Sequence, residues 1–188
     1  AFEDQEEALN ARDFHALSAC MAQIDGLAFY NSGPAAGASQ QHKHLQLVPL
    51  PVAPSGPPIP MQPALHLDTL GDGVSTSPRL PFVHGFARLD PDLFFAPATA
   101  AAVMLGRYND LLQATGLSIC AGKPSSPYNL LITRHWMLLV PRTSGVFDSL
   151  PANGLGFAGS LLAKDDQSIK KIKEYGPMTL LKNVAVAS

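Results

Sequence analysis

Two long stretches of the sequence repeat their apolar residues at the spacing of an α-helix. In residues 6–24 the apolar positions are Leu9, Phe14, Leu17, Met21 and Ile24. In residues 97–115 they are Ala100, Val103, Met104, Tyr108 and Leu111. A period of about 3.6 residues places each set on one helix face. The pattern predicts helices over both stretches, and one or two shorter helices near residues 166–175 and 177–187.

Four short apolar runs are typical of β-strands, and they cover residues 27–31, 42–49, 128–133 and 136–141. The last two are almost continuously apolar, as expected of central strands buried on both faces. Residues 32–39 are small and read as a loop. Seven prolines between residues 49 and 63 predict an irregular connection, because proline removes a backbone donor. Residues 68–81 are also expected to form a loop. Strands mixed with helices, without a visible boundary, predict one α+β or α/β domain over residues 1–188.

Composition narrows the classes of function. Of the 188 residues 46% are apolar and 15% are charged, which excludes a disordered chain. The net charge of −2 gives no basic surface for nucleic acid. No apolar run approaches the roughly 20 residues that cross a bilayer. Cys20 and Cys120 lie in apolar stretches and are expected to be buried free thiols. With an acidic first segment in place of a signal peptide, the chain is expected in the cytoplasm.

The chemistry of the sequence is concentrated near residue 44. In a strand, His42, His44 and Gln46 share one face, each about 6.6 Å from the next, with Lys43, Leu45 and Leu47 opposite. The preceding glycine-containing loop lets backbone N–H groups converge on an anion such as phosphate. An imidazole beside a phosphate site is a suitable nucleophile at phosphorus. Its second ring nitrogen needs an acceptor, and a nearby backbone carbonyl is a candidate.

These segments resemble a known family. Residues 31–34 (Asn-Ser-Gly-Pro), 37–40 (Gly-Ala-Ser-Gln) and 42–46 (His-Lys-His-Leu-Gln) resemble the histidine-triad superfamily. Within it they resemble the diadenosine tetraphosphate (Ap4A) phosphorylases, or ATP adenylyltransferases, in which the third triad position is Gln. Residues 128–142 and 153–160 resemble two further blocks of these enzymes. The resemblance implies an α+β, HIT-like fold with a mostly antiparallel sheet and flanking helices. It also implies that an N-terminal segment of the family precedes the part matched by residues 1–10.

The resemblance implies a role for each site residue. His44 attacks the α-phosphorus of Ap4A, ATP leaves, and phosphate then releases the adenylyl group as ADP. The backbone carbonyl of His42 orients the ring, and the Gln46 amide holds phosphate oxygens. Contacts with phosphates and ribose are implied for Asn31, Gly37, Ser39 and Gln40. Lys43 is expected at the solvent or the pocket rim and is a candidate phosphate contact. No cofactor or metal site is specified, although Mg²⁺ can accompany the polyphosphate.

Several alternatives remain open at this stage. The galactose-1-phosphate uridylyltransferases share His-x-His-x-Gln, but typically with proline where Lys43 stands. A second alternative is a nucleotide-binding module without turnover, and a third is zinc binding by His42 and His44. Arg134, His135 and Arg142 are either phosphate ligands or solvated residues, and Trp136 either stacks on adenine or belongs to the core. The partners expected are Ap4A, ATP and phosphate, with no nucleic acid or membrane. The oligomeric state is open.

Overall fold

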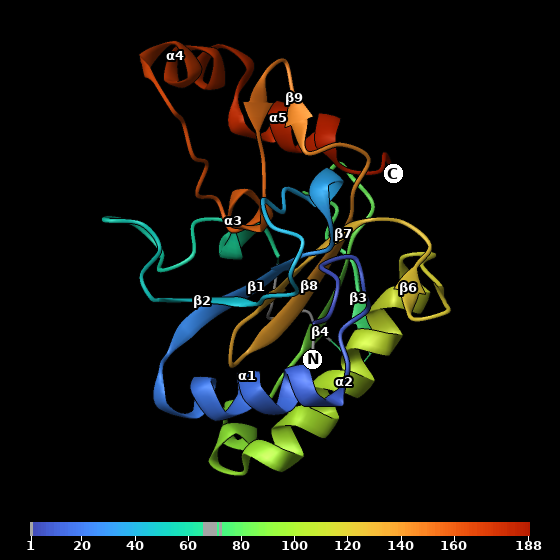
Figure 1. The fold of residues 1–188 in the computed structure, drawn as a ribbon. Helices are drawn as coiled ribbons and strands as arrows, with labels where there is room; N and C mark the ends of the chain where they lie inside the picture. Colours follow the sequence, from blue (N-terminus) through green and yellow to red (C-terminus); the bar gives the residue numbers. More distant parts are fainter. Residues whose placement is uncertain (1, 66–70, 72) are drawn as a thin grey trace.

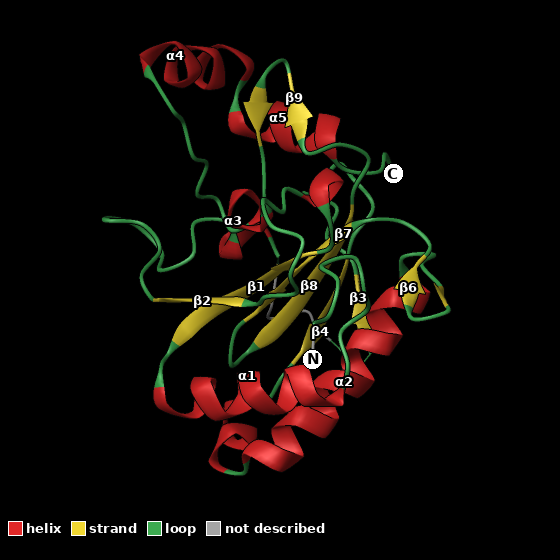
Figure 2. Cartoon of the chain, in the orientation of Figure 1, coloured by secondary structure: helices red, strands yellow, loops and turns green. Residues whose placement is uncertain are grey.

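A six-stranded antiparallel sheet organises the chain (Figures 1 and 2). The computed structural model describes residues 2–65, 71 and 73–188. The strand order is β2-β1-β7-β8-β4-β3. These strands are β1 (Gly26–Asn31), β2 (Gln46–Pro49), β3 (Val74–Ser75), β4 (Gly85–Arg88), β7 (Tyr128–Ile132) and β8 (Trp136–Pro141). The sequence therefore predicted the central strands β7 and β8 to within a residue. The mostly antiparallel sheet with flanking helices is confirmed.

The α-helices fall near their predicted positions, except the short helix over residues 154–157, which the sequence did not predict. They are α1 (Ala11–Gln23), α2 (Pro97–Ala114), α3 (Gly154–Phe157), α4 (Asp166–Tyr175) and α5 (Pro177–Val184). The predicted start of the first helix at residue 6 is wrong, because Asn10 caps it. The Asn10 side chain accepts from the Arg12 N–H at 2.8 Å, and Asp13 accepts from the Asn10 N–H at 2.8 Å. This reciprocal capping leaves residues 2–9 free to form a separate segment.

Two hydrophobic clusters lie on the two faces of the sheet. Along β1, Ala28 and Tyr30 pack in the cluster that contains α1 and α2, whereas Leu27 and Phe29 pack in the other cluster. Figure 1 shows α1 and α2 side by side along one face. The opposite cluster is completed by Phe157 of α3 and by residues of α5. Successive strand residues alternate in direction, so Asn31 belongs to the face that α3 covers.

Smaller elements lie around this sheet. They are the pairs β5 (Ile119–Cys120) with β6 (Lys123–Pro124) and β9 (Val146–Phe147) with β10 (Leu150–Pro151), and the short helices η1 (Pro34–Ala36), η2 (Gln62–Ala64) and η4 (Pro91–Phe95). Residues 50–61 form no helix or strand, as their prolines predicted. Part of the loop predicted over residues 68–81 lies outside the described residues. Within it, Val74 and Ser75 form strand β3, contrary to prediction, because they pair with β4.

The prediction of buried thiols is wrong. Cys20 and Cys120 are both free and exposed. Cys20 lies on α1, whose core-facing stripe is Phe14, Leu17, Ser18 and Met21, so the cysteine falls outside that stripe. Cys120 lies in the two-residue strand β5, whose residues are both exposed. An apolar neighbourhood in sequence was therefore a poor guide to burial at these two positions.

Candidate active site

The predicted strand over residues 42–49 forms only from Gln46 onward. β2 pairs with β1 from Gly26 opposite Pro49 to Phe29 opposite Gln46. Before Gln46 the chain leaves β1 and pairs instead with the N-terminal segment. Asp4 forms an antiparallel bridge with His42, and the Lys43 N–H donates to the Glu3 carbonyl at 2.8 Å. From Leu45 onward the predicted alternation holds, because Leu45 and Leu47 pack against the α1–α2 cluster while Gln46 pairs with Phe29 of the other face.

His44 is held by the backbone of its own segment. Its ring Nδ1 lies 2.9 Å from the carbonyl oxygen of His42. A carbonyl only accepts hydrogen bonds, so this contact requires a proton on Nδ1 and leaves the lone pair of a neutral ring on Nε2. The ring is half-buried, and no described residue bonds to its Nε2. The imidazole is therefore oriented by one nitrogen and available for chemistry at the other.

Gln5 is a residue near His44 that the sequence did not single out. It is 1% exposed, and its side-chain oxygen accepts from the His44 N–H at 2.7 Å. Its side-chain nitrogen donates to the Asn31 carbonyl at 2.8 Å and to the His44 carbonyl at 3.3 Å. Gln5 immediately precedes residues 6–24, over which the apolar period predicts a helix. No spacing or composition signal distinguishes it from the polar residues beside it.

Lys43 is not the solvent-facing or pocket-rim charge that was expected. Its side chain is 4% exposed, and its Nζ lies 2.8 Å from a Glu3 carboxylate oxygen and 2.9 Å from one of Asp13. Burial alone would lower the pKa of the ammonium group. The hydrogen bonds and charges of Glu3 and Asp13 outweigh burial and raise that pKa. Lys43 also lowers the pKa of Glu3. The ammonium group ties the nucleophile segment to α1 and to the N-terminus, so we leave it out of the phosphate contacts proposed below.

The loop before His42 uses most of its early backbone donors internally. The N–H groups of Ala36 and Ala38 donate to the Gly33 carbonyl, and that of Gly37 donates to Pro34. The prediction that this part of the loop converges on an anion is therefore wrong. Among the described residues, nothing accepts from the N–H groups of Ser39 and Gln40, and both residues are exposed. The donors left for a ligand lie at the end of the loop, next to the histidines.

The packing of the loop explains why residue 37 is a glycine, which the sequence did not reveal. Its φ of +89° lies in the left-handed region, which favours glycine. A Cβ atom there would also lie 2.6 Å from the Ala152 carbonyl oxygen and 2.8 Å from Asn153 Cα. Gly37 thus lets the loop pack directly against the segment that leads into α3. This brings together the blocks near residues 31–46 and 153–160.

A buried polar network supports the loop from behind. Asn31 Oδ1 accepts from Asn129 Nδ2 at 2.8 Å and from the Gly154 N–H at 2.9 Å. Asn129 Nδ2 also donates to the Ala36 carbonyl at 2.8 Å. Asn31 Nδ2 has no acceptor among the described residues, so it remains available to a ligand. The network was not foreseen, although Asn129 is a polar residue inside a strand otherwise apolar from Tyr128 to Ile132, and that contrast is a usable signal.

Arg142 is neither a phosphate ligand nor a solvated residue. It is 1% exposed, and its guanidinium bonds to Asn129 Oδ1 and to four carbonyls, those of Ala36, Ser144, Ala152 and Val184. Five N–H groups are all that a guanidinium has. Burial lowers the pKa of Arg142 to about 10, so the group stays charged at neutral pH. Its role is to join the loop, β7 and the segment before α3.

The structure also shows the surroundings of Arg134, His135 and Trp136, whose roles the sequence left open. Arg134 donates through Nε and Nη2 to the Met21 carbonyl, at 2.8 and 2.6 Å, in the last turn of α1. His135 is exposed at the turn between β7 and β8. Trp136 is 1% exposed within the cluster on the α3 face, so it belongs to the core. The block over residues 128–142 supports the site and supplies no side chain to its surface.

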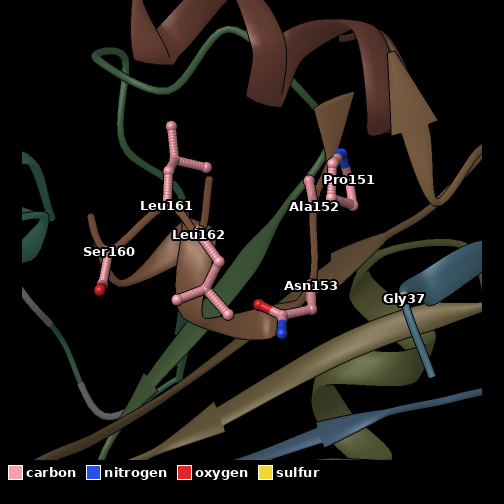
Figure 3. A pocket seen from close by; sticks show the side chains of 8 residues that line it. Gly37, Pro151, Ala152, Asn153, Ser160, Leu161 and Leu162 are labelled. Carbon is pink, nitrogen blue, oxygen red and sulfur yellow. The ribbon is translucent and has the colours of Figure 1, made fainter. Parts of the chain in front are cut away.

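Two cavities flank the loop. One of about 340 Å³ is lined by Asp4, Gln5, Glu6, Pro34, Ala38, Ser39, Gln40 and Gln41. A smaller one of about 90 Å³ is lined by Gly37, Pro151, Ala152, Asn153, Gly156, Ser160, Leu161 and Leu162. Figure 3 shows the Asn153 side chain between Gly37 and the Leu161–Leu162 segment. Ser39 and Gln40 thus line the larger cavity, and His44 is not among the residues that line either of the two.

The described residues do not present a metal cluster or a membrane span. Nowhere among them do three His, Cys, Asp or Glu side chains gather to hold an ion. No third side chain of this kind joins His42 and His44 in the part of the chain that the structure covers. None of the described helices has the length and apolar character to cross a membrane.

Comparison with known proteins shows the family to which the chain belongs. A family model described as the ATP adenylyltransferase C-terminal domain matches residues 78–187, and one described as the Ap4A phosphorylase N-terminal domain matches residues 1–67. The chain is 28% identical over 198 residues to diadenosine 5',5'''-P1,P4-tetraphosphate phosphorylase 2 of Saccharomyces cerevisiae. That alignment covers 92% of this chain and 59% of the relative. The chain thus spans about three fifths of the length of this curated relative.

Solved structures show the same fold. The crystal structure of yeast Ap4A phosphorylase Apa2 is similar with a TM-score of 0.77 and 24% identity, over 100% of this chain and 66% of that one. The structure of the same yeast protein in complex with Ap4A gives a TM-score of 0.75 and 22% identity, over 99% of this chain and 66% of that one. At these identities the likeness concerns the arrangement of the backbone. It confirms the predicted fold class.

Proposed function

We propose, for a chain that belongs to the ATP adenylyltransferase (Ap4A phosphorylase) family, that its site catalyses phosphorolysis of Ap4A to ATP and ADP. The single observation that carries the proposal is that no described residue bonds to His44 Nε2 while His44 Nδ1 contacts the His42 carbonyl. This contact presents the opposite nitrogen, Nε2, as a nucleophile. In the sequence, His44 follows the unpaired backbone donors of Ser39 and Gln40, at the end of a glycine-containing loop, by five and four residues.

The reaction runs in two displacements at one phosphorus atom. His44 Nε2 attacks the α-phosphorus of Ap4A, a P–N bond forms, and the P–O bond to the remaining triphosphate breaks, so ATP leaves. Inorganic phosphate then attacks the same phosphorus from the opposite side, the P–N bond breaks, and ADP leaves. The His42 carbonyl accepts the Nδ1–H throughout and stabilises the positive charge that develops on the ring when Nε2 bonds to phosphorus.

The residues around His44 divide into ligands and supports in this proposal. The N–H groups of Ser39 and Gln40, the Asn31 Nδ2 group and the Gln46 amide donate to phosphate or ribose oxygens. Gln46 suits this role because it is exposed and stands at the first position of β2, two residues beyond His44. Such preorganised donors stabilise charge that develops on non-bridging oxygens. Gly37 shapes the loop that carries them.

The proposal also covers the domain organisation, the cofactor requirement and the cell compartment. The chain functions as one domain over residues 1–188, since the six-stranded sheet combines strands from both family-model matches. No protein-bound cofactor is needed for either displacement, and Mg²⁺ enters with the polyphosphate. Two free, exposed thiols favour a reducing compartment such as the cytoplasm. Soaking the purified protein in a chelator before assay, and then adding Mg²⁺, measures the cation requirement.

Product analysis tests the proposal. The chain is incubated with Ap4A, with and without phosphate, and the nucleotides are separated by anion-exchange chromatography. We expect ATP and ADP in equal amounts, with ADP appearing only when phosphate is present. UDP-glucose with galactose 1-phosphate provides the matched test of uridylyl transfer. Faster turnover of that pair, or calorimetric binding of ATP with no product from Ap4A, would replace phosphorolysis by the corresponding alternative.

A further inference from the structure

Gln5 occupies a place in the sheet that a backbone partner would normally fill. The register of β1 and β2 pairs Phe29 with Gln46. Two residues further along the same antiparallel ladder, Asn31 would stand directly opposite His44. The ladder ends before that pair, and the Gln5 amide lies between the two residues. It donates to the Asn31 carbonyl at 2.8 Å and accepts from the His44 N–H at 2.7 Å.

Both the backbone and the side chain of Gln5 are held by hydrogen bonds. The Gln5 N–H donates to the Gln41 carbonyl at 2.8 Å, and its carbonyl accepts from the buried Tyr30 hydroxyl. Lys43 holds the same N-terminal segment through its contact with Glu3. The amide can stand in only one orientation, because its oxygen faces an N–H group and its nitrogen faces two carbonyls.

We propose that Gln5 is the positioning residue of the nucleophile: its side-chain amide splits the β1–β2 ladder at the Asn31–His44 pair and holds the His44 peptide away from β1. This proposal rests on the proposed role of His44. Release of His44 from the ladder lets its ring turn back to the His42 carbonyl, which lies two residues earlier. Without the amide, the two strands close toward the direct pairing, or the His44 peptide loses its fixed position. In either case the ring–carbonyl contact is weakened.

The chemistry of the gap explains why glutamine fits it. The gap requires one acceptor and at least one donor on a chain long enough to cross from the N-terminal segment. Leucine fills the volume but leaves the His44 N–H and the Asn31 carbonyl unpaired. Ionised glutamate supplies the acceptor but places a carboxylate oxygen against two carbonyls. Protonated glutamate again has one O–H donor and one acceptor, so it can replace the amide at low pH.

The first test needs no substrate. Nitrogen-15 NMR of histidine-labelled protein reports which ring nitrogen carries the proton, and His44→Asn identifies the His44 signals among the six histidines. We expect wild-type His44 to show the single Nδ1–H tautomer and Gln5→Leu to show a mixture of both tautomers. The matched control is Ser18→Ala, which removes a buried hydroxyl bonded to the Pro97 carbonyl at 2.8 Å, in the helix layer. Wild-type nitrogen shifts in folded Gln5→Leu would overturn the proposal.

The second test separates positioning from general stability. We expect Gln5→Leu to lower kcat for Ap4A about 10²-fold, as misplacement by about 1 Å does, with KM within about threefold. Ser18→Ala is expected to lower the unfolding midpoint and leave kcat unchanged. If Gln5→Leu does not fold, Gln5→Glu carries the test. The ratio of its kcat to that of wild type should rise as pH falls from 8 to 6. The neighbouring Asp4, Glu6, Lys43 and His44 are present in both proteins, so their titration largely cancels in that ratio.

Equal kcat losses in Gln5→Leu and in Ser18→Ala, at equal destabilisation, would show that Gln5 is merely structural. A pH-independent ratio for Gln5→Glu would contradict the role of the amide donor. If the wild-type protein forms no product from Ap4A, the proposed function fails, whereas the NMR comparison still decides whether Gln5 controls the His44 ring.

Discussion

Two histidines of this chain make the same local contact and end in different situations. His44 Nδ1 lies 2.9 Å from the carbonyl of His42, and His84 Nδ1 lies 2.8 Å from the carbonyl of Phe82, in each case two residues earlier. At His84 the second nitrogen accepts from the Ser77 N–H at 2.8 Å, and the residue is 6% exposed. At His44 the second nitrogen has no partner among the described residues, and the ring is half-buried.

The difference shows where reactivity is decided. A carbonyl contact fixes the tautomer at both positions, so it does not by itself mark a nucleophile. At His84 both ring nitrogens are used by the backbone, and the imidazole joins the segment around Ser77 to the sheet. At His44 the remaining nitrogen has no partner among the described residues. The open nitrogen separates the proposed nucleophile, His44, from His84, whose two ring nitrogens are both bonded.

The largest expected effect is the loss of turnover when His44, and not His84, is replaced. His44→Asn should lower the phosphate-dependent turnover of Ap4A at least about 10³-fold, because the reaction loses its nucleophile. His84→Asn is the matched control. It should leave kcat within about threefold and lower the unfolding free energy by about 1–3 kcal/mol, since the Ser77 N–H loses its acceptor. Steady-state kinetics and urea unfolding of both variants measure this. Equal losses of kcat in the two variants would contradict the assignment.

The next effect is on stability and concerns the buried hydrogen bonds of Arg142 behind the loop. Arg142→Met should lower the unfolding free energy by at least about 3 kcal/mol, because the change leaves several buried carbonyls unpaired. Arg88→Met, at an exposed position of β4, should change it by less than about 0.5 kcal/mol. Urea denaturation monitored by far-UV circular dichroism compares the two. A small effect of Arg142→Met would mean that its five contacts contribute little to the fold.

A smaller effect sharpens the role of the open donors. Gln46→Leu should lower kcat about 10²-fold, the cost of one donor to charge that develops in a transition state. Gln113→Leu replaces an exposed glutamine on α2, on the helix side of the sheet, and should not change kcat. Single-turnover kinetics with excess enzyme report the adenylylation step directly. An unchanged rate in Gln46→Leu would remove this residue from the phosphate contacts.

The smallest effect separates the two histidines by pH. Burial lowers the pKa of His84 from its usual 6.5, against a smaller opposite effect of the Phe82 carbonyl. Below pH 6.5 the unfolded chain therefore binds a proton that the folded chain does not bind until the lowered pKa is reached. The unfolding free energy should fall as pH decreases through this window. Urea unfolding at several pH values should show a shallower slope in His84→Asn than in wild type. Identical slopes would contradict the effect of burial.

Sequence patterns predicted the parts of this molecule that depend on local periodicity. The period of apolar residues located α2, β7 and β8, because a buried face must repeat at the period of its element. The order of Asn31, Gly37, His44 and Gln46 led to the proposal of His44 as the nucleophile, which stays a prediction. The contact of His44 with the His42 carbonyl, implied by the family resemblance, is present.

The parts that failed depend on contacts between distant residues. Lys43 is buried against Glu3 and Asp13, and β2 starts only at Gln46, two residues after the His44 N–H that donates to the Gln5 side chain. Arg142 finds its acceptors in four separate segments of the chain. Such contacts leave no periodic trace in one sequence, since each partner is an ordinary polar residue where it stands.

The covalent intermediate tests the central claim most directly. Wild-type protein and His44→Asn are incubated with Ap4A without phosphate, and their intact masses are measured. The account predicts that wild type gains the mass of one adenylyl group, that His44→Asn gains none, and that added phosphate removes the group as ADP. Formation of ATP and ADP by wild type without any adduct, or an adduct on His44→Asn, would contradict it.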